Sequence, residues 1–174
     1  LITPDDMVYE TAALIHEEVI SVCSPDYLEQ YGSIETPKKE SGHTLLFVTE
    51  PRVTWRQFFD GKMPFDVINA RRLTFSNYSV LLQTAISGQG IALGWLDSNI
   101  DLLLKGVLVP ASERKIKTGR HYSIHSTSNK IRQPHVRHVR DWLVTEMKKD
   151  LYLYHSRFKG ELTFGKSNLP KIKR

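Results

Sequence analysis

Histidine and cysteine side chains are the first candidates for chemistry in this sequence. His121 and His125 are four residues apart in a segment with the pattern of a strand, and His135 and His138 are three residues apart at the start of a helix. Neither pair has a carboxylate or thiol at metal-ligand spacing, and the zinc motif H-E-x-x-H does not occur. We interpret these histidines as surface or capping residues. Cys23 lies in a hydrophobic segment, where a buried free thiol is commoner than a nucleophile.

The glycine-containing segment 88–90 has the wrong connection for phosphate binding. It joins a helix to a strand, whereas a phosphate-binding loop joins a strand to the start of a helix. Neither a P-loop nor the G-x-S-x-G motif of hydrolases occurs. Because no acid/base pair or nucleophile can be nominated, we expect a protein without catalytic activity, metal or other cofactor.

Residues 73–79 are the strongest candidate for ligand binding. They form a strand that runs into a helix whose first turn carries Ser76, Asn77 and Tyr78. Unpaired N–H groups at a helix N-terminus favour anionic ligand groups, and ligands of open α/β sheets collect at the carboxyl ends of strands. The alternative is that Ser76 or Asn77 only caps the helix.

Aromatic residues form a second group of candidates. Trp55, Phe75, Tyr78 and Trp95 could line a pocket, or they could belong to the hydrophobic core. Three of them lie beside the ends of predicted strands, which favours a pocket.

The elements that position these residues alternate between strands and helices. Strands are predicted at 19–23, 43–48, 73–75, 90–95, 107–109 and 122–125. Short helices are predicted after Pro25, from Thr36-Pro37 to Gly42 and over 55–61, and longer ones over 76–88, over 99–105 and from Pro134. In the helix after residue 76, Val80, Leu81, Thr84 and Ala85 are expected to share the packed face, and Val136, Val139, Leu143 and Met147 do so in the last helix. This order predicts an α/β fold with a largely parallel sheet.

Composition places the chain among ordinary globular proteins. It has 174 residues, of which 40% are hydrophobic and 25% charged, without an apolar run long enough to span a bilayer. A single cysteine and no visible leader fit a cytoplasmic protein with no membrane partner. The net charge of +5 comes from residues 148–174, which hold eight basic and two acidic residues. The near-neutral body is therefore a poor candidate for binding nucleic acid.

Several segments together resemble the effector domain of LysR-type transcriptional regulators. They are Val22 to Leu28, Thr36-Pro37 with His43 to Leu46, Leu73 to Ala85, Ser87 to Trp95, Leu103 to Val109, and Pro134 to Leu143. The stretch from Leu73 to Trp95 is the most specific, and it resembles the regulators of glycine cleavage and of choline-sulfate utilisation. The likeness covers about residues 14 to 147. Lys39 and Glu40 depart from it, because the family usually has Asp-Leu there.

The resemblance implies a type-2 periplasmic-binding-protein-like fold with two Rossmann-like lobes joined by a hinge. Residues 1–21 and 96–150 would form part of the first lobe, 22–95 the second lobe, and 151–174 a basic C-terminal tail. The family's winged helix-turn-helix and the opening of its first lobe have no counterpart in this sequence, so we expect an incomplete first lobe. The matched ligand-binding positions are Thr49, Trp55, Phe75, Ser76, Asn77, Tyr78 and Trp95.

The function that the resemblance implies is effector sensing. A small zwitterion, such as an amino acid or a choline derivative, would bind between the lobes. Its binding would control homodimers or higher homo-oligomers that are bound to DNA. Such proteins contact DNA only through the winged helix-turn-helix. The alternative is a solute-binding protein of a transporter, which shares the fold. A third possibility, a small transferase or dehydratase of this fold, would need an acid/base pair that we cannot nominate.

Overall fold

The central sheet combines antiparallel and parallel strand pairs. The computed structural model describes residues 9–37, 42–127 and 133–158. Strand β1 (Tyr9–Cys23) pairs antiparallel with β6 (Ala92–Trp95) and with β7 (Val109–Thr127), and β4 (Thr44–Val48) pairs in parallel with β5 (Arg71–Phe75). Hydrogen bonds of 2.9 Å, from Leu46 N to Ile91 O and from Ile91 N to Thr44 O, join β4 to the chain entering β6. The spatial order is therefore β5-β4-β6-β1-β7.

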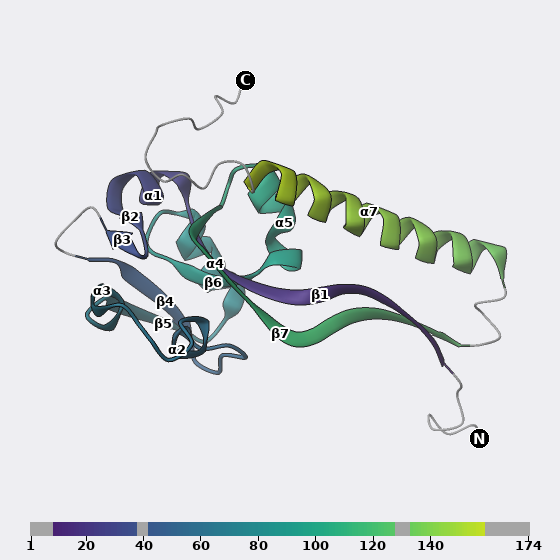
Figure 1. Ribbon diagram of the computed structural model, residues 1–174, viewed down its shortest axis with the longest axis horizontal. Helices are drawn as coiled ribbons and strands as arrows, with labels where there is room; N and C mark the ends of the chain where they lie inside the picture. The colour runs from purple at the N-terminus through teal and green to yellow at the C-terminus, as the bar shows by residue number, and fades with distance from the viewer. Residues whose placement is uncertain (1–8, 38–41, 128–132, 159–174) are drawn as a thin grey trace.

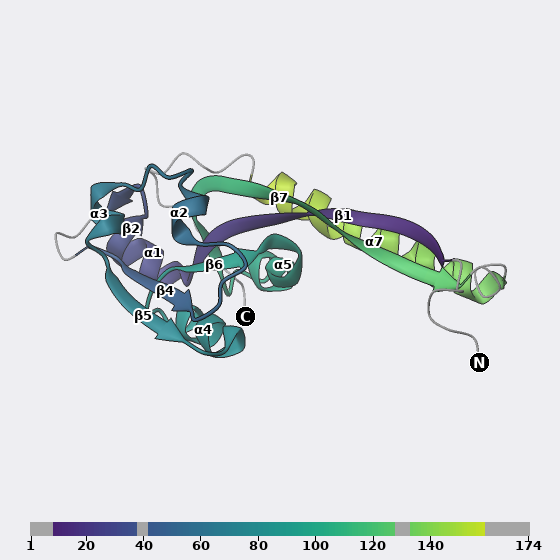
Figure 2. The same ribbon diagram turned by 90° about the horizontal axis from the view of Figure 1, so that it is seen from below.

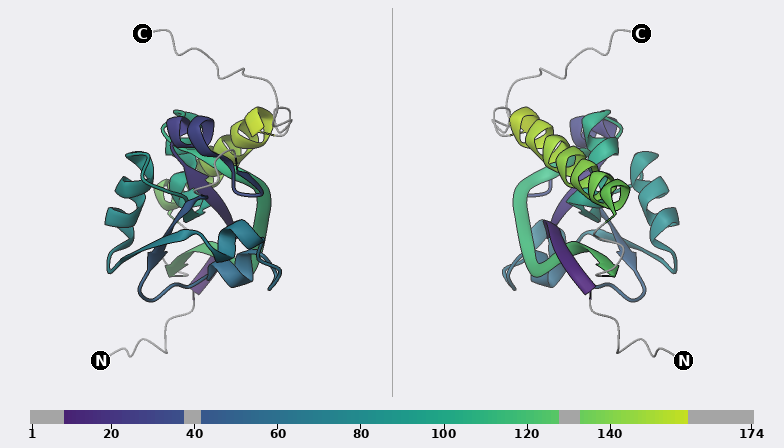
Figure 3. Two further views of the ribbon diagram at one scale, coloured as in Figure 1. Left: turned by 90° about the vertical axis from the view of Figure 1, so that its left-hand side faces the viewer. Right: turned by 90° about the vertical axis from the view of Figure 1, so that its right-hand side faces the viewer.

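Neighbouring residues of a strand enter two different cores, because side chains alternate across a sheet. Leu45 and Ile91 are buried on one face together with Tyr27, Trp55 and aromatic neighbours. Their sequence neighbours Leu46 and Ala92 are buried on the other face. The sheet is thus covered by helices on both sides, as the end-on view shows (Figure 3).

Local capping signals explain where the helices begin. Helix α1 (Pro25–Tyr31) starts after Ser24, whose hydroxyl accepts from Tyr27 N at 3.2 Å. Helix α2 (Trp55–Phe58) begins with a reciprocal capping box between Thr54 and Gln57. The remaining helices on the body are α3 (Phe65–Ile68), α4 (Tyr78–Ile86) and α5 (Leu96–Leu104).

One long helix and two long strands extend beyond this body. The outer parts of β1 and β7 leave it as a twisted two-stranded ribbon, and α7 (Pro134–Phe158) runs alongside (Figures 1 and 2). Register shifts near Ala13, His16 and Ile20 interrupt the β1–β7 ladder. Such bulges increase the local twist of a ribbon. Only the C-terminal end of α7 is anchored in the core, through the buried side chain of Tyr154.

The prediction of a helix at Thr36-Pro37 is wrong. These residues form β3 (Thr36–Pro37), which pairs antiparallel with β2 (Gly32–Ser33). The hydroxyl of Ser33 accepts from Thr36 N at 3.2 Å and lies 2.9 Å from the Thr36 hydroxyl, so Ser33 closes a turn where we expected Thr36 to cap a helix. The remainder of the predicted helix, residues 38–41, lies outside the described residues.

The strands predicted at 107–109 and 122–125 also need correction. The described structure has one strand, β7, which begins at Val109, the last residue of the first segment, and continues through the second because β1 pairs along its length. The sheet is mixed, whereas a largely parallel one was expected, since β1 runs antiparallel to both of its neighbours.

The last helix is longer than predicted, and its packed face differs. We expected a tail from Leu151, but α7 continues to Phe158, with Leu151, Tyr154 and Phe158 against the core. Val139, which we placed on the packed face, is 54% exposed. Val80 in α4, which we also placed on a packed face, is 53% exposed. The division into lobes at 22–95 stays a prediction.

Candidate functional site

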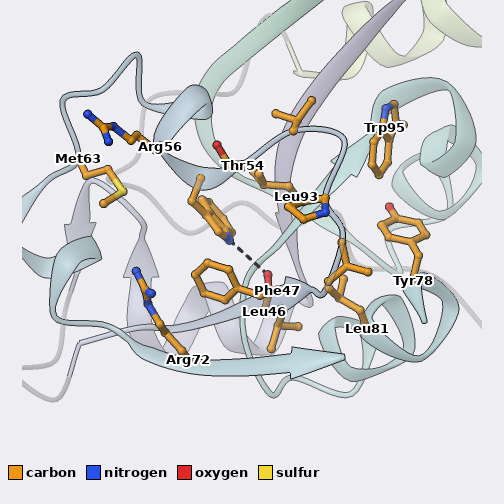
Figure 4. A pocket seen from close by; sticks show the side chains of 14 residues that line it. Leu46, Phe47, Thr54, Arg56, Met63, Arg72, Tyr78, Leu81, Leu93 and Trp95 are labelled. Atoms are coloured by element: carbon orange, nitrogen blue, oxygen red, sulfur yellow. Dashed lines mark hydrogen bonds between the residues drawn. The ribbon is translucent and has the colours of Figure 1, made fainter. Parts of the chain in front are cut away.

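A cavity of about 280 Å³ opens beside the carboxyl ends of β4 and β6. This volume is near the lower limit for small-molecule sites, which range from roughly 300 to 1,000 Å³. Its lining comes from β4, the loop before α2, α2 itself, the loop after it, the start of β5, α4 and β6 (Figure 4). The lining residues are Leu46, Phe47, Val48, Pro51, Val53, Thr54, Trp55, Arg56, Met63, Arg72, Tyr78, Leu81, Leu93 and Trp95.

Trp55 forms one wall and is held firmly in place. Its indole Nε1 donates to the carbonyl of Leu46 at 3.2 Å, and only 4% of the residue is exposed. Phe58 packs edge-on against the indole, with the ring centroids 5.8 Å apart. Because Thr54 caps the same short helix, the indole is positioned before any ligand arrives.

Tyr78 and Trp95 form an aromatic wall on the other side. Their ring centroids lie 5.3 Å apart in an edge-to-face arrangement. Asn99 Nδ2 donates to the Tyr78 hydroxyl at 3.2 Å and to the Trp95 carbonyl at 2.7 Å. Burial raises the pKa of Tyr78, and the hydrogen bond from Asn99 opposes this shift. Tyr78 therefore stays a neutral phenol at physiological pH.

The formal charges in the cavity lining belong to Arg56 and Arg72. Arg56 lies on α2 and Arg72 on β5, and the Arg72 guanidinium carbon is 4.9 Å from the ring centroid of Phe47. Neither Asp nor Glu is among the lining residues. The cavity thus combines aromatic and aliphatic walls with a positive end.

The structure brings three of the predicted site residues together at this cavity. Trp55, Tyr78 and Trp95 line it, whereas Thr49, Phe75, Ser76 and Asn77 are outside the lining set.

These four residues lie at the neighbouring ends of β4 and β5. Thr49 N and Oγ1 donate to the Phe75 carbonyl at 2.9 and 3.1 Å, and Asn77 Oδ1 accepts from Ser79 N at 2.7 Å as the cap of α4. Asn77 therefore fulfils the capping alternative, and ligand binding by any of the seven residues stays a prediction.

Sequence reasoning missed Arg56 and Arg72. Arg56 follows Trp55 directly, so a search of the neighbours of predicted site residues would have found it. Arg72 is the second residue of β5, and its approach to Phe47 depends on the parallel register that sets Leu45 opposite Arg72. Cross-strand register is not readable from one segment alone.

The four histidines considered as metal ligands do not form a metal site in the described part of the chain. His121, His125, His135 and His138 are exposed, and the described residues contain no group of three or more His, Cys, Asp or Glu that could hold a metal ion. Within the described ranges, no helix combines the length and apolarity needed to cross a membrane.

Comparison with known families identifies this arrangement. The LysR substrate binding domain matches residues 3–148. The chain belongs to this family. Domains of this family are regulatory, and the periplasmic-binding-protein-like α/β fold expected from the sequence is confirmed. No curated protein sequence matches the chain.

Solved structures of LysR-family effector domains share the fold. The AmpR effector domain of Pseudomonas aeruginosa is 21% identical with a TM-score of 0.55, over 86% of this chain and 69% of that one. The AmpR effector binding domain of Citrobacter freundii is 21% identical with a TM-score of 0.55, over 81% and 68%. The CrgA regulatory domain of Neisseria meningitidis is 23% identical with a TM-score of 0.51, over 83% and 72%. The resemblance to the glycine-cleavage and choline-sulfate regulators stays a prediction.

Proposed function

We propose that this LysR substrate-binding domain senses a small organic effector in the cavity between Trp55, Tyr78 and Trp95. The observation that carries the proposal is the cavity itself, a concave, mainly apolar site with few polar groups at the carboxyl edge of parallel strands. The family match supports a regulator over the solute-binding protein of a transporter.

The contacts of Tyr78 suggest how binding would be transmitted. Asn99 on α5 is hydrogen-bonded both to Tyr78 on α4 and to the end of β6 at Trp95. A ligand that moves the Tyr78–Trp95 pair would therefore shift α5, which packs against α7 through the core that holds Tyr154. In the proposed regulator this shift changes the geometry of a homodimer whose winged helix-turn-helix domains bind DNA.

The expected effector is a small zwitterion such as an amino acid or a choline derivative. Aromatic rings at Tyr78 and Trp95 suit a quaternary ammonium through cation–π contact, and a cationic or helix-terminal group suits its anionic end.

Calorimetry with a panel of betaines, choline esters and amino acids tests the proposal. We expect binding by at least one compound, weakened about tenfold or more by Tyr78→Ala, because a buried aromatic contact of roughly 1.5–3 kcal/mol is lost. The control is Ser79→Ala, at an exposed neighbour that is not in the cavity lining. If no compound in the panel binds, the zwitterionic effector is wrong, and if Tyr78→Ala binds as well as Ser79→Ala, the cavity is not the binding site.

A further inference from the structure

The cavity is asymmetric in charge along its length. Arg56, Met63 and Arg72 gather at one end, and Tyr78 and Trp95 lie at the other, with Phe47 between them (Figure 4). Thr54 and Tyr78 supply the hydroxyl groups of the lining, and apart from the two arginines its other side chains are apolar or aromatic. An arrangement of this kind has a preferred orientation for a ligand with one charged end.

Arg72 is held in a geometry that leaves its donors available. Its guanidinium carbon is 4.9 Å from the Phe47 ring centroid, and stacking on an aromatic face leaves the N–H groups at the edge of the guanidinium free to donate. Among the described residues, the ion pairs involve neither Arg72 nor Arg56. The positive end of the cavity is therefore not neutralised by a described acidic side chain.

Both arginines are exposed, but the cavity walls beside them are mainly apolar. A carboxylate and a guanidinium form parallel charge-assisted hydrogen bonds, and these are stronger beside low-polarity walls than in water. An ammonium group at the same end would meet two positive charges. By contrast, the start of α4 already has a cap, because Asn77 Oδ1 accepts from Ser79 N.

We propose that the effector is an organic carboxylate with an apolar body, whose anionic group binds Arg72 and Arg56 while its body lies along Phe47 and Trp55 towards Tyr78. This inference rests on the proposed function and deepens it, because two arginines without an acidic side chain in the lining favour a carboxylate over a zwitterion and give the ligand an orientation. The anionic end is assigned to the two arginines, at the opposite end of the cavity from Tyr78 and Trp95.

Tryptophan fluorescence offers a direct measurement. Of the three tryptophans, Trp55 and Trp95 line the cavity, whereas Trp142 on α7 is 58% exposed. In a Trp142→Phe background, quenching then reports on the cavity. The probes are phenylacetate, phenylacetamide and phenylacetamidine, which are similar in shape and carry charges of about −1, 0 and +1 at neutral pH. We expect phenylacetate to bind about tenfold or more tighter than the amide, and the amidine to bind most weakly.

Variants at neighbouring arginines test the assignment. Arg72→Gln should weaken the binding of phenylacetate much more than the binding of phenylacetamide and so remove most of the preference for the carboxylate, and Arg72→Lys should retain part of that preference. Arg71→Gln is the matched control, because Arg71 is exposed on the same strand and does not line the cavity. Thermal unfolding followed by circular dichroism checks that each variant is folded.

The outcomes separate this inference from the proposed function. Equal binding of phenylacetate and phenylacetamide, with quenching of Trp55 and Trp95, would overturn the carboxylate assignment and leave the cavity as a binding site. A preference that persists in the Arg56→Gln/Arg72→Gln double variant would also overturn it. If none of the three probes quenches the cavity tryptophans, both the cavity and the carboxylate assignment are contradicted.

Discussion

Cysteine has the most reactive side chain of the residue types in this sequence, and the buried position of Cys23 suppresses that reactivity. The side chain lies on β1 and has no exposed surface. Burial raises the pKa of the Cys23 thiol to about 12, although a backbone hydrogen bond from Leu28 partly opposes the shift. Because the thiolate is the nucleophile, Cys23 acts as a packing residue in the folded protein.

Two consequences of this burial can be measured. Iodoacetamide at pH 8.5 should label Cys23 quickly in guanidinium chloride and only very slowly in the native protein. In addition, the unfolded thiol loses its proton near pH 9, whereas the folded thiol keeps it until about pH 12. The unfolded state therefore binds fewer protons in this window, so the contribution of Cys23 to stability is fully present below pH 9 and falls as the pH rises towards 12.

Two buried tyrosines also lower the stability of the folded protein as the pH rises above 8. A Cys23 variant separates their contribution from that of the thiol. Burial raises the pKa of Tyr27 and of Tyr154 from 10.0 to about 12. The free energy of unfolding, measured in urea, should therefore be lower at pH 10.5 than at pH 8, and Cys23→Ala should reduce this difference. Native labelling as fast as in denaturant, or a pH dependence unaffected by Cys23→Ala, would contradict the interpretation.

At the scale of elements, the join between β4 and β6 depends on one glycine. A Cβ atom at Gly90 would lie 2.7 Å from the carbonyl oxygen of Thr44 and 2.9 Å from Leu46 Cδ2. Real Cβ atoms essentially never make such contacts, and a backbone oxygen within a sheet cannot move away cheaply. Gly90 therefore allows the close approach that carries the hydrogen bonds between β4 and Ile91.

Gly90→Ala should lower the free energy of unfolding by about 1–3 kcal/mol, the usual cost of overpacking. The reduced entropy of the unfolded alanine chain offsets only about 0.4–1 kcal/mol of this. The control is Ser87→Ala, an exposed position just before the same strand, which should change stability by less than about 0.5 kcal/mol. Urea denaturation measures both variants, and equal stabilities would show that β6 can shift without cost.

Elements that depend on local signals could be predicted from the sequence. Asn77 caps α4 and Pro25 opens α1, and each signal lies within a few residues of the element it begins. Features that depend on distant pairing could not be predicted. The continuity of β7 requires β1 as a partner, and the basic residues around α7 obscure the helical spacing of Tyr154 and its apolar neighbours.

The candidate site also has a part that depends on local signals and a part that depends on distant strand pairing. The aromatic walls at Trp55, Tyr78 and Trp95 could be predicted because each residue lies at the end of a strand or the start of a helix. Arg72 at the positive end could not be predicted, because it reaches the cavity only through the register of β5 on β4.

At the scale of the whole molecule, burial decreases from the body towards the end of the ribbon. Val19 and Val22 on β1 are fully buried, whereas Leu14 and Ile15 are only half-buried and His16 is exposed. Helix α7 shows the same trend, since Tyr154 is 6% exposed and Trp142 is 58% exposed. The body thus holds the most tightly packed parts of these long elements.

Arg157 strengthens the anchored end of α7. Its guanidinium donates to the carbonyl of Leu104, at the C-terminal end of α5, and lies over the ring of Phe158. A cation at this position satisfies a carbonyl that has no partner within its own helix. The link therefore joins α7 to α5 in addition to their apolar contacts.

Hydrogen exchange should reveal this gradient within single elements. Amides of β1 between Val19 and Cys23 lie between two strands and can exchange only when the core opens, whereas those near Ile15 pair with β7 alone, beside register shifts. We expect exchange at least about tenfold slower at the inner positions, which corresponds to about 1.4 kcal/mol in opening free energy. Leu46 on β4 serves as the internal reference for core opening. Uniform protection along β1, equal to that of Leu46, would mean that the ribbon and the body unfold as one unit.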